Sequence, residues 1–419
     1  MKLAQISALS AAIFMATSAQ ANAFLDESSL NLELRNFYQA KTADKEPTKS
    51  GDTVDYANSQ WAQGVRLDFS SGYFENIVGL DLGAYYSLKL GASNIDLIDE
   101  SLKNPGLLRV DGNGDSHSYG KTSYAIKFNL FDMGVAKYGR MFLDTPLVND
   151  SDSRVLPSLS EGFYADVTVS GLSAHTAWIT KGNGKTASGF EDYEAGDDGD
   201  SEAVMTLGGA YDFGNGLELS ADYASQSNFA KKYLGEASFS TEIEGVEVGV
   251  AGQYGQVSRT GDNKKADKDN SQYTYGLKLE AGVGHADFGV AYTKVESTDI
   301  GSYIVGWSGG DDDTGYFGYN SIQISDFDDN GQKAWGFSAG YDFEGIVDGL
   351  SVKGIYVMGD TKTQDETEYN IDINYAIPQV EGLTARLRYA KNTKEPSGSA
   401  DDIVATDTRV ILKYNVAVF

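Results

Sequence analysis

The chain ends with the stretch GLTARLRYAKNTKEPSGSADDIVATDTRVILKYNVAVF, residues 382–419, in which two segments alternate between apolar and polar side chains. In the first segment Leu387 lies between Arg386 and Arg388, and the second repeats the pattern around Arg409. Because successive side chains of a β-strand point to opposite faces, each segment predicts a strand with one apolar and one cationic face. We interpret the two strands as a terminal hairpin whose apolar face contacts lipid and whose cationic face lines a pore.

The composition is that of an acidic, aromatic-rich chain. Its 419 residues include 61 Asp and Glu against 33 Lys and Arg, which gives a formal net charge of −28, and 12% of them are aromatic. Nucleic-acid partners are disfavoured because binding phosphate requires a cationic surface. The aromatic content also argues against a disordered chain. The chain has no cysteine, which excludes a disulfide scaffold and thiolate metal ligands.

Residues 1–23 have the features of a secretory signal peptide. Lys2 precedes a run of mostly apolar or small residues, and Ala21-Asn22-Ala23 matches a small-x-small cleavage site. We therefore expect export, cleavage after Ala23, and a single mature domain over residues 24–419. Beyond this segment no apolar run approaches the ~20 residues that a membrane-spanning helix needs, so any passage through a membrane must use strands.

From residue 24 onward, apolar side chains recur at every second position in segments of roughly 9 to 14 residues. This pattern predicts an all-β fold, a transmembrane antiparallel β-barrel of about 18 strands with a polar face toward a water-filled lumen. An even number of strands places both termini on one side of the membrane. The expected strands cover 29–39, 58–70, 76–89, 119–131, 133–142, 161–170, 172–181, 202–213, 216–226, 231–241, 245–257, 271–282, 285–297, 333–343, 349–360, 366–377, 382–392 and 405–418.

Two kinds of break separate these strands. Short breaks such as 70–72 and 214–215 contain glycine, which supplies the positive φ of tight turns. Short turns on one side and long polar loops on the other are typical of a barrel inserted from the periplasm. The long polar breaks are expected at 40–57, 90–118, 182–201, 258–270, 298–332 and 393–404.

The break MFLDTPLVNDSDSRVLPSLS, residues 141–160, fits neither kind and contains Pro146 and Pro157. A wide barrel needs a segment that narrows it, so we interpret this break as a loop folded into the lumen. An ordinary surface loop is the alternative. The candidate charged residues of this constriction loop, in it or beside it, are Arg140, Asp144, Asp150, Asp152 and Arg154.

Several motifs resemble the OprD family of substrate-specific outer-membrane porins, whose third loop constricts the pore. The resemblance implies a barrel of about eighteen strands with infolded loops, which takes up small nutrients by facilitated diffusion past a row of lumenal basic residues. The motifs read FLDESSLNLELRNFY (24–38), YGRMF (138–142), DTP (144–146), DSRVLP (152–157), EG (161–162), GQKAWGFSAGYDF (331–343), LRYAKN (387–392) and DTRVILKYN (407–415).

The strand phases independently predict a row of lumenal cations. The last strands meet the first ones when a barrel closes, so these cations should share one arc of the wall and bind carboxylates that pass along it. The alternative is that they only pair with lumenal acids such as Glu33, Asp68 and Asp372. The predicted substrate-binding ladder consists of Arg35, Arg66, Lys353, Arg386, Arg388, Arg409 and Lys413.

The acidic runs, such as 111–115 and 311–313, lack the glutamate at the twelfth position of a calcium loop, so we expect solvated loops rather than a metal site. Such loops could bridge lipopolysaccharide phosphates through divalent ions, and outer-membrane lipids are the other expected partners. The histidines lie far apart in the sequence, and no nucleophile elbow or H-E-x-x-H motif occurs. We therefore expect neither an enzyme nor a cofactor.

The sequence thus predicts an outer-membrane porin for facilitated diffusion of small carboxylate-bearing nutrients, either amino acids or organic and aromatic acids. One alternative is an oligosaccharide-selective, chitoporin-like channel, in which lumenal aromatics such as Tyr85 would outrank the arginines. Another is a structural or adhesive barrel. The substrate stays open, as does the choice between monomer and homotrimer.

Overall fold

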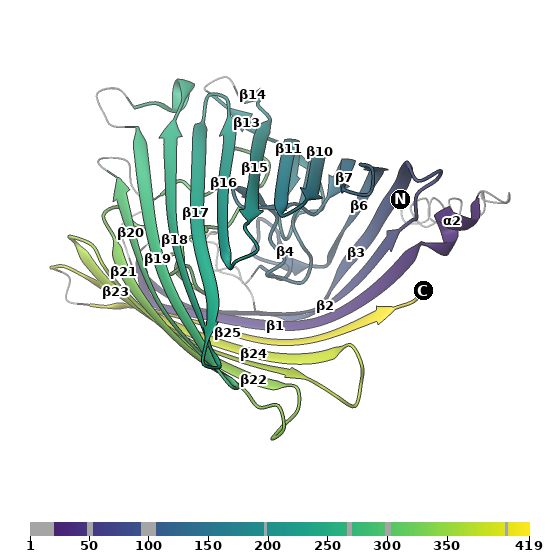
Figure 1. Ribbon diagram of the computed structural model, residues 1–419. Coiled ribbons are helices and arrows are strands. Elements are labelled where there is room, and N and C mark those ends of the chain that lie inside the picture. The colour runs from purple at the N-terminus through teal and green to yellow at the C-terminus, as the bar shows by residue number, and fades with distance from the viewer. Residues whose placement is uncertain are drawn as a thin grey trace.

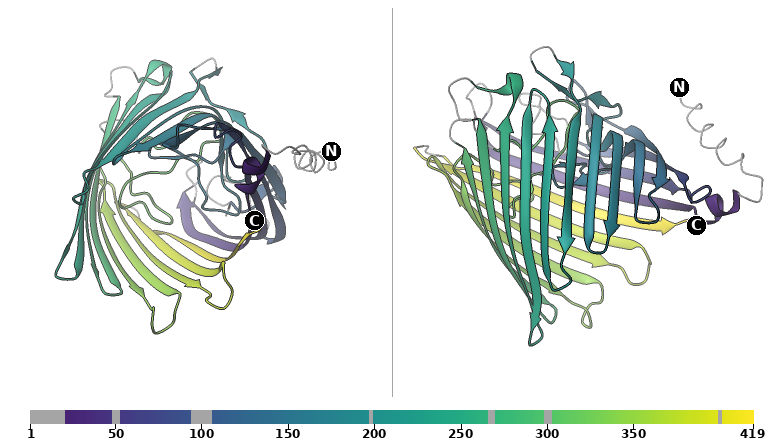
Figure 2. Two further views of the ribbon diagram at one scale, coloured as in Figure 1. Left: turned by 45° about the vertical axis from the view of Figure 1, so that its right-hand side comes forward. Right: turned by 45° about the horizontal axis from the view of Figure 1, so that its top comes forward.

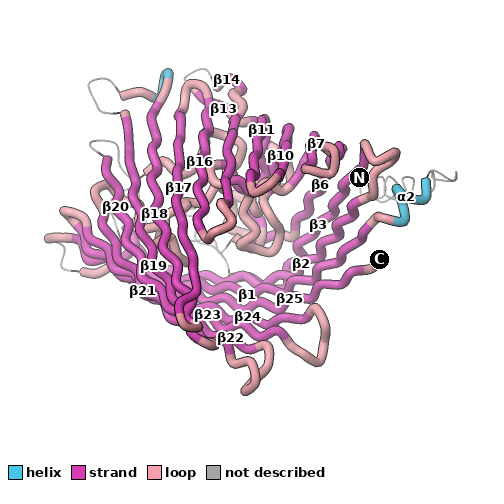
Figure 3. The backbone as a smooth tube through the Cα atoms, in the orientation of Figure 1, coloured by secondary structure: helices cyan, strands magenta, loops and turns pink. Residues whose placement is uncertain are grey.

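The computed structural model describes residues 21–47, 53–93, 106–196, 199–265, 270–297, 303–398 and 401–419. Long antiparallel strands dominate it, and β25 pairs with β1 to close a barrel of 18 strands (Figures 1 and 3). The wall strands are β1 (Ser29–Pro47), β2 (Thr53–Ser70), β3 (Val78–Ala92), β6 (Tyr119–Asn129), β7 (Gly134–Met141), β10 (Leu159–Val169), β11 (Leu172–Asn183), β15 (Val204–Asp212), β16 (Leu217–Gln226), β17 (Ala230–Ile243), β18 (Val246–Arg259), β19 (Ser271–Val283), β20 (Ala286–Ser297), β21 (Lys333–Asp342), β22 (Leu350–Asp360), β23 (Gln364–Ala376), β24 (Leu383–Pro396) and β25 (Ile403–Ala417).

The side chains face as the alternation predicts. Leu387 and Leu412 are 42% and 44% exposed on the outer wall, whereas Arg35 and Arg409 are 6% and 4% exposed. Neighbouring strands keep this phase because each residue pairs in register across the ladder, as Leu387 does with Val410. The apolar side chains therefore cover the outside of the barrel and the guanidinium groups point into it.

The strands extend further toward the long loops than expected. The predicted long break at 40–57 was wrong at both flanks, because β1 continues to Pro47 and β2 begins at Thr53. Polar side chains continue the ladder there: Thr42 on β1 and Thr406 on β25 share a hydrogen bond of 2.7 Å. Outside the apolar belt, a strand can continue with polar residues on both faces, so periodicity alone does not show where it ends.

A short helix, α2 (Ala21–Asp26), precedes β1 and spans the predicted cleavage position. Most of the predicted signal peptide lies outside the described residues, so its removal stays a prediction. Within the described ranges, no helix has the length and apolar character needed to cross a membrane.

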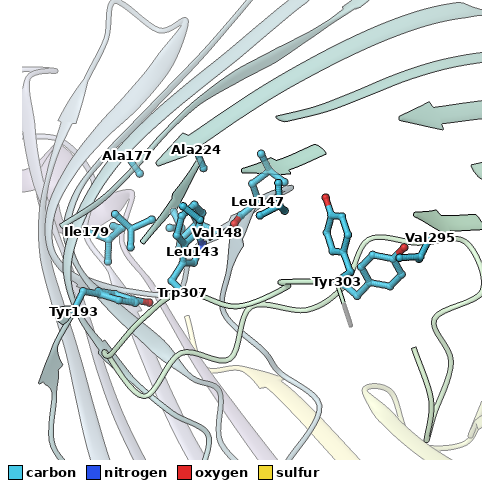
Figure 4. Close-up of a cluster of buried hydrophobic side chains, with 14 residues drawn as sticks. Leu143, Leu147, Val148, Ala177, Ile179, Tyr193, Ala224, Val295, Tyr303 and Trp307 are labelled. Carbon is cyan, nitrogen blue, oxygen red and sulfur yellow. Dashed lines mark hydrogen bonds between the residues drawn. The ribbon is translucent and has the colours of Figure 1, made fainter. Parts of the chain in front are cut away.

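Two of the loops that fold into the barrel border the candidate functional site (Figure 2). One is the constriction loop between β7 and β10, which contains the small hairpin of β8 (Asp144–Thr145) and β9 (Val148–Asn149). The other joins β20 to β21 and is described from residue 303 to 332. They meet inside the lumen, where the Trp307 indole N–H donates to the Leu147 carbonyl over 2.9 Å. Leu143, Leu147 and Trp307 belong to one buried apolar cluster with Ile179 of the wall (Figure 4).

Candidate functional site

Five of the predicted ladder residues surround one cavity of about 360 Å³ on the inner wall, here called the basic cavity. They come from β1, β24 and β25, which are adjacent because the barrel closes between β25 and β1. Within this wall Arg388 is the cross-strand partner of Arg409, and Arg35 is the partner of Lys413. The lining residues are Arg35, Phe37, Asp152, Ser153, Asn374, Thr384, Arg386, Arg388, Arg409, Ile411 and Lys413.

Carboxylates neutralise part of this positive charge. Arg386 Nε donates to Asp372 over 2.8 Å, Arg388 Nε lies 3.4 Å from the same carboxylate, and Arg409 Nη2 lies 2.6 Å from Asp407. In the described ion pairs around the cavity, six cations share four acids, which leaves a net charge of 6 − 4 = +2. The six are Arg35, Arg66, Arg386, Arg388, Arg409 and Lys413, and the four are Glu33, Asp152, Asp372 and Asp407.

Arg35 and Arg66 fasten the constriction loop to the wall. Arg35 Nη1 donates to the Arg154 carbonyl over 2.7 Å, and Arg66 Nε donates to the Val155 carbonyl over 2.9 Å. Both guanidinium groups also bond the Asp152 carboxylate, at 3.0 and 2.6 Å. Burial alone would raise the pKa of Asp152, but the two arginines outweigh it and lower that pKa. Arg66 is absent from the lining of the basic cavity and therefore acts on the loop.

Lys353 on β22 does not line the basic cavity. Its amine is 3.4 Å from Asp287, and it lines a second cavity of about 700 Å³ with Arg386 and Asp372. That cavity also contains His285 and Glu344, which belong to the short-turn end of the barrel. Because Asn374 and Arg386 line both cavities, the basic cavity continues toward the side on which the two termini lie.

The chain has relatives among known proteins. A family model described as "outer membrane porin, OprD family" matches residues 22–418. The chain belongs to the OprD family of outer-membrane porins. Porin D of Pseudomonas aeruginosa is 26% identical to it over 442 residues, covering 97% of this chain and 94% of that protein. The family resemblance is therefore confirmed, and with it an outer-membrane channel that is not an enzyme.

Solved structures share the fold of this OprD-family porin. The crystal structure of Pseudomonas aeruginosa OccK9 (OpdG) superposes with a TM-score of 0.79 at 22% identity, covering 94% of this chain and all of that one. The crystal structure of Pseudomonas aeruginosa OpdK with vanillate superposes with a TM-score of 0.77, also at 22% identity and over 94% of this chain and all of that one. At this level of identity the two structures show that the barrel fold is shared.

The constriction loop of this porin contributes charge to the cavity unevenly. Arg154 lies near Arg409, and its burial together with that guanidinium lowers the pKa of Arg154 to about 10. Asp150 lies partly buried at the base of the β8–β9 hairpin, where it accepts the Leu143 amide over 2.7 Å. Burial, with a smaller contribution from the nearby Asp312 carboxylate, raises the pKa of Asp150 to about 8 although its hydrogen bonds act in the opposite direction.

Two other candidates of the constriction loop lie away from the basic cavity. Arg140 is on β7, where it pairs with Glu161 at 2.6 Å and stacks over the Phe190 ring at 4.2 Å. Its cross-strand partner Tyr124 is exposed on the outer wall, so Arg140 belongs to that face. Asp144 lines a separate cavity of about 440 Å³ with Tyr316 and other residues where the two infolded loops meet.

The acidic run 311–313 is only in part the solvated loop that the sequence predicts, because Asp311 is exposed whereas Asp312 and Asp313 are partly buried. Asp311 accepts the Gly184 amide over 3.0 Å, and Asp312 accepts the Tyr193 hydroxyl over 3.0 Å. Burial raises the pKa of Asp312. The reason is tertiary: the loop folds inward, so its carboxylates also bind backbone amides and hydroxyls of the barrel.

Sequence reasoning also missed the segment 320–328, which reaches the basic wall. Gln323 donates its side-chain amide to the Asp407 carbonyl over 2.9 Å, and Arg409 donates to the Gln323 carbonyl over 3.4 Å. Loop composition gave no signal for this contact, because both acceptors are backbone carbonyls, which every residue has.

Proposed function

We propose that this porin conducts small organic carboxylates along the basic cavity. The observation that carries the proposal is the cluster of cavity-lining cations, which exceeds the acids that share its ion pairs. Guanidinium groups bind carboxylates through two parallel hydrogen bonds, and a low-dielectric wall strengthens the attraction. Asp372 and Asp407 keep binding moderate, which conduction requires because a substrate must also leave.

The relatives support the same direction. OpdK has been crystallised with vanillate, an aromatic carboxylate, and shares this barrel fold. In this chain Ile411 lines the basic cavity among the arginines, so a substrate with an apolar group next to its carboxylate would meet a matching side chain. This favours organic and aromatic acids among the carboxylates.

The oligosaccharide alternative is disfavoured because Tyr85, the aromatic side chain expected to bind a sugar, is buried. Tyr85 is 9% exposed, and its hydroxyl donates to Asp68 over 2.5 Å and shares a hydrogen bond of 3.0 Å with Ser123. A buried ring in this network offers no open face on which a sugar could stack.

Planar-bilayer recording tests the proposal. Benzoate is expected to block the KCl current in a concentration-dependent way, whereas chitobiose at the same concentration should leave it unchanged. Block by the sugar alone would reject the carboxylate assignment. Absence of any conductance after reconstitution would favour a structural or adhesive barrel.

We also propose that residues 1–23 direct export and are removed after Ala23. The small-x-small site Ala21-Asn22-Ala23 supports it. Intact-mass measurement of the protein from isolated outer membranes should give a chain that begins at Phe24. A mass that includes Met1 would reject cleavage.

A further inference from the structure

The described part of the loop between β20 and β21, residues 303–332, is fastened to one wall by buried polar side chains. Lys232 on β17 donates to the Gly306 carbonyl over 2.7 Å. Gln226 on β16 exchanges two hydrogen bonds with the backbone of Ser308, at 2.8 and 2.9 Å. These contacts hold the first half of the loop to β16 and β17, which are not neighbours of β1, β24 and β25, the strands that carry the basic cavity.

Glu368 on β23 fastens the second half. One carboxylate oxygen accepts the Ile324 amide over 3.0 Å, and the other accepts the Ser325 amide over 2.9 Å. Glu368 is 0% exposed, and among the described residues no cation lies within ion-pair distance of it. A buried carboxylate is costly unless hydrogen bonds satisfy it, so the two amides and the loop position depend on each other.

This contact lies beside the basic cavity. Gln323, the residue before Ile324, bonds the Asp407 carbonyl and accepts from Arg409. Arg409 lines the cavity, and Asp407 lies on its long-loop side along β25. The 320–328 segment therefore borders the basic cavity on the side from which an external substrate arrives.

We propose that Glu368 is a positioning residue of the channel. By holding the Ile324 and Ser325 amides it keeps the 320–328 segment against Arg409, and so sets the width of the opening to the basic cavity. Without this carboxylate the segment moves off the wall, and ions and substrate pass with less restriction. The inference rests on the proposed function only for the identity of the substrate, because the width of the opening is measurable with KCl alone.

The first experiment compares Glu368→Ala and Glu368→Gln with Glu395→Ala, which removes an exposed glutamate on the neighbouring strand β24. The single-channel KCl conductance should rise about twofold in Glu368→Ala. Glu368→Gln keeps one acceptor oxygen and should fall between Glu368→Ala and wild type. Glu395→Ala should match wild type. The difference in electrophoretic mobility between unheated and heated samples shows whether each barrel is folded. Conductance in folded Glu368→Ala equal to that of Glu395→Ala would overturn the proposal.

The second experiment replaces the lost contact with a covalent tether. If the variants raised the conductance only by destabilising the barrel, such a tether would not return it to the wild-type value. The chain has no cysteine, so Ile324→Cys/Glu368→Cys can be joined selectively by a short bis-thiol reagent. Reagent should return the raised conductance of this double variant to the wild-type value, and reduction should raise it again. A conductance that stays high with the tether in place would contradict positioning by Glu368. If benzoate fails to block the wild-type channel while the Glu368 variants still change the KCl conductance as expected, the carboxylate proposal is rejected and the role of Glu368 stands.

Discussion

Arg388 on β24 and Arg409 on β25 are direct cross-strand partners, so two guanidinium groups face the lumen side by side. Like charges directly opposite one another destabilise a sheet. The flanking carboxylates offset this: Asp372 lies opposite Arg388 on β23, and Asp407 pairs with Arg409. A pair of this kind is expected where function, rather than stability, sets the residue types.

Replacing Arg388 with Gln should therefore stabilise the barrel while weakening carboxylate binding. Removal of the like-charge contact is worth roughly 0.2–1 kcal/mol, and thermal unfolding in detergent would measure it. The concentration of benzoate that half-blocks the current should rise at least severalfold. Lys391→Gln, which changes a cation on the same strand outside the cavity lining, is the control and should leave block unchanged. Unchanged block in Arg388→Gln would remove this residue from the ladder.

Asp152 is predicted to fix the constriction loop through Arg35 and Arg66. Asp152→Asn keeps an acceptor oxygen but removes the charge that both guanidinium groups bond, so the loop should lose about 1–3 kcal/mol of stabilisation. Limited proteolysis between residues 142 and 158 should become faster. Ser153→Ala, at the exposed neighbouring position, is the matched control. Equal cleavage rates in the two variants would argue that Asp152 does not hold the constriction loop in place.

Gly64 on β2 leaves room for the constriction loop. A Cβ placed there would lie 2.8 Å from Val155 Cγ1 and 3.2 Å from the Val155 carbonyl oxygen, so the loop would have to shift. Gly64→Ala should cost about 1–3 kcal/mol by overpacking and change the single-channel conductance. Gly91→Ala on β3 is the control because a Cβ there meets nothing within 4 Å. Identical conductance in both variants would mean that the loop adjusts without consequence.

Asp150 is predicted to make loop stability depend on pH. Its pKa is about 8 in the folded state against an ordinary value of 3.8, so the unfolded chain releases this proton first. The contribution of Asp150 is therefore present at pH 4, declines as pH rises between these two values, and levels off above pH 8. Asp150→Asn removes this dependence, and its advantage over wild type should grow from near zero at pH 4 to about 1–3 kcal/mol at pH 8. Thermal unfolding at the two pH values would show it; an advantage independent of pH would contradict the assignment.

Much of the barrel could be predicted because all its strands follow one rule, the alternation of apolar and polar side chains. The alternation around Arg386 and Arg409 indicates both the strands and their facing, and closure of the barrel then brings Arg35 beside Lys413. The inward fold of the constriction loop was also predictable from its break in the pattern and its two prolines.

The partners of the charges could not be predicted in this way. Arg66 has the same phase as Arg35, yet it bonds a loop far along the chain and does not line the cavity. The partners of Asp311 and Glu368 could not be predicted for the same reason. Each carboxylate accepts a backbone amide from a distant loop, and every residue type except proline has that amide.

The surplus of cavity-lining cations, four arginines and Lys413, over the carboxylates that pair with them should make the channel select anions. Reversal potential under a KCl gradient, measured for wild type and for Arg386→Ala/Arg388→Ala, tests it most directly. Wild type should be anion-selective, and the double variant should shift toward cations. Cation selectivity in wild type, or a reversal potential that the double variant leaves unchanged, would contradict it.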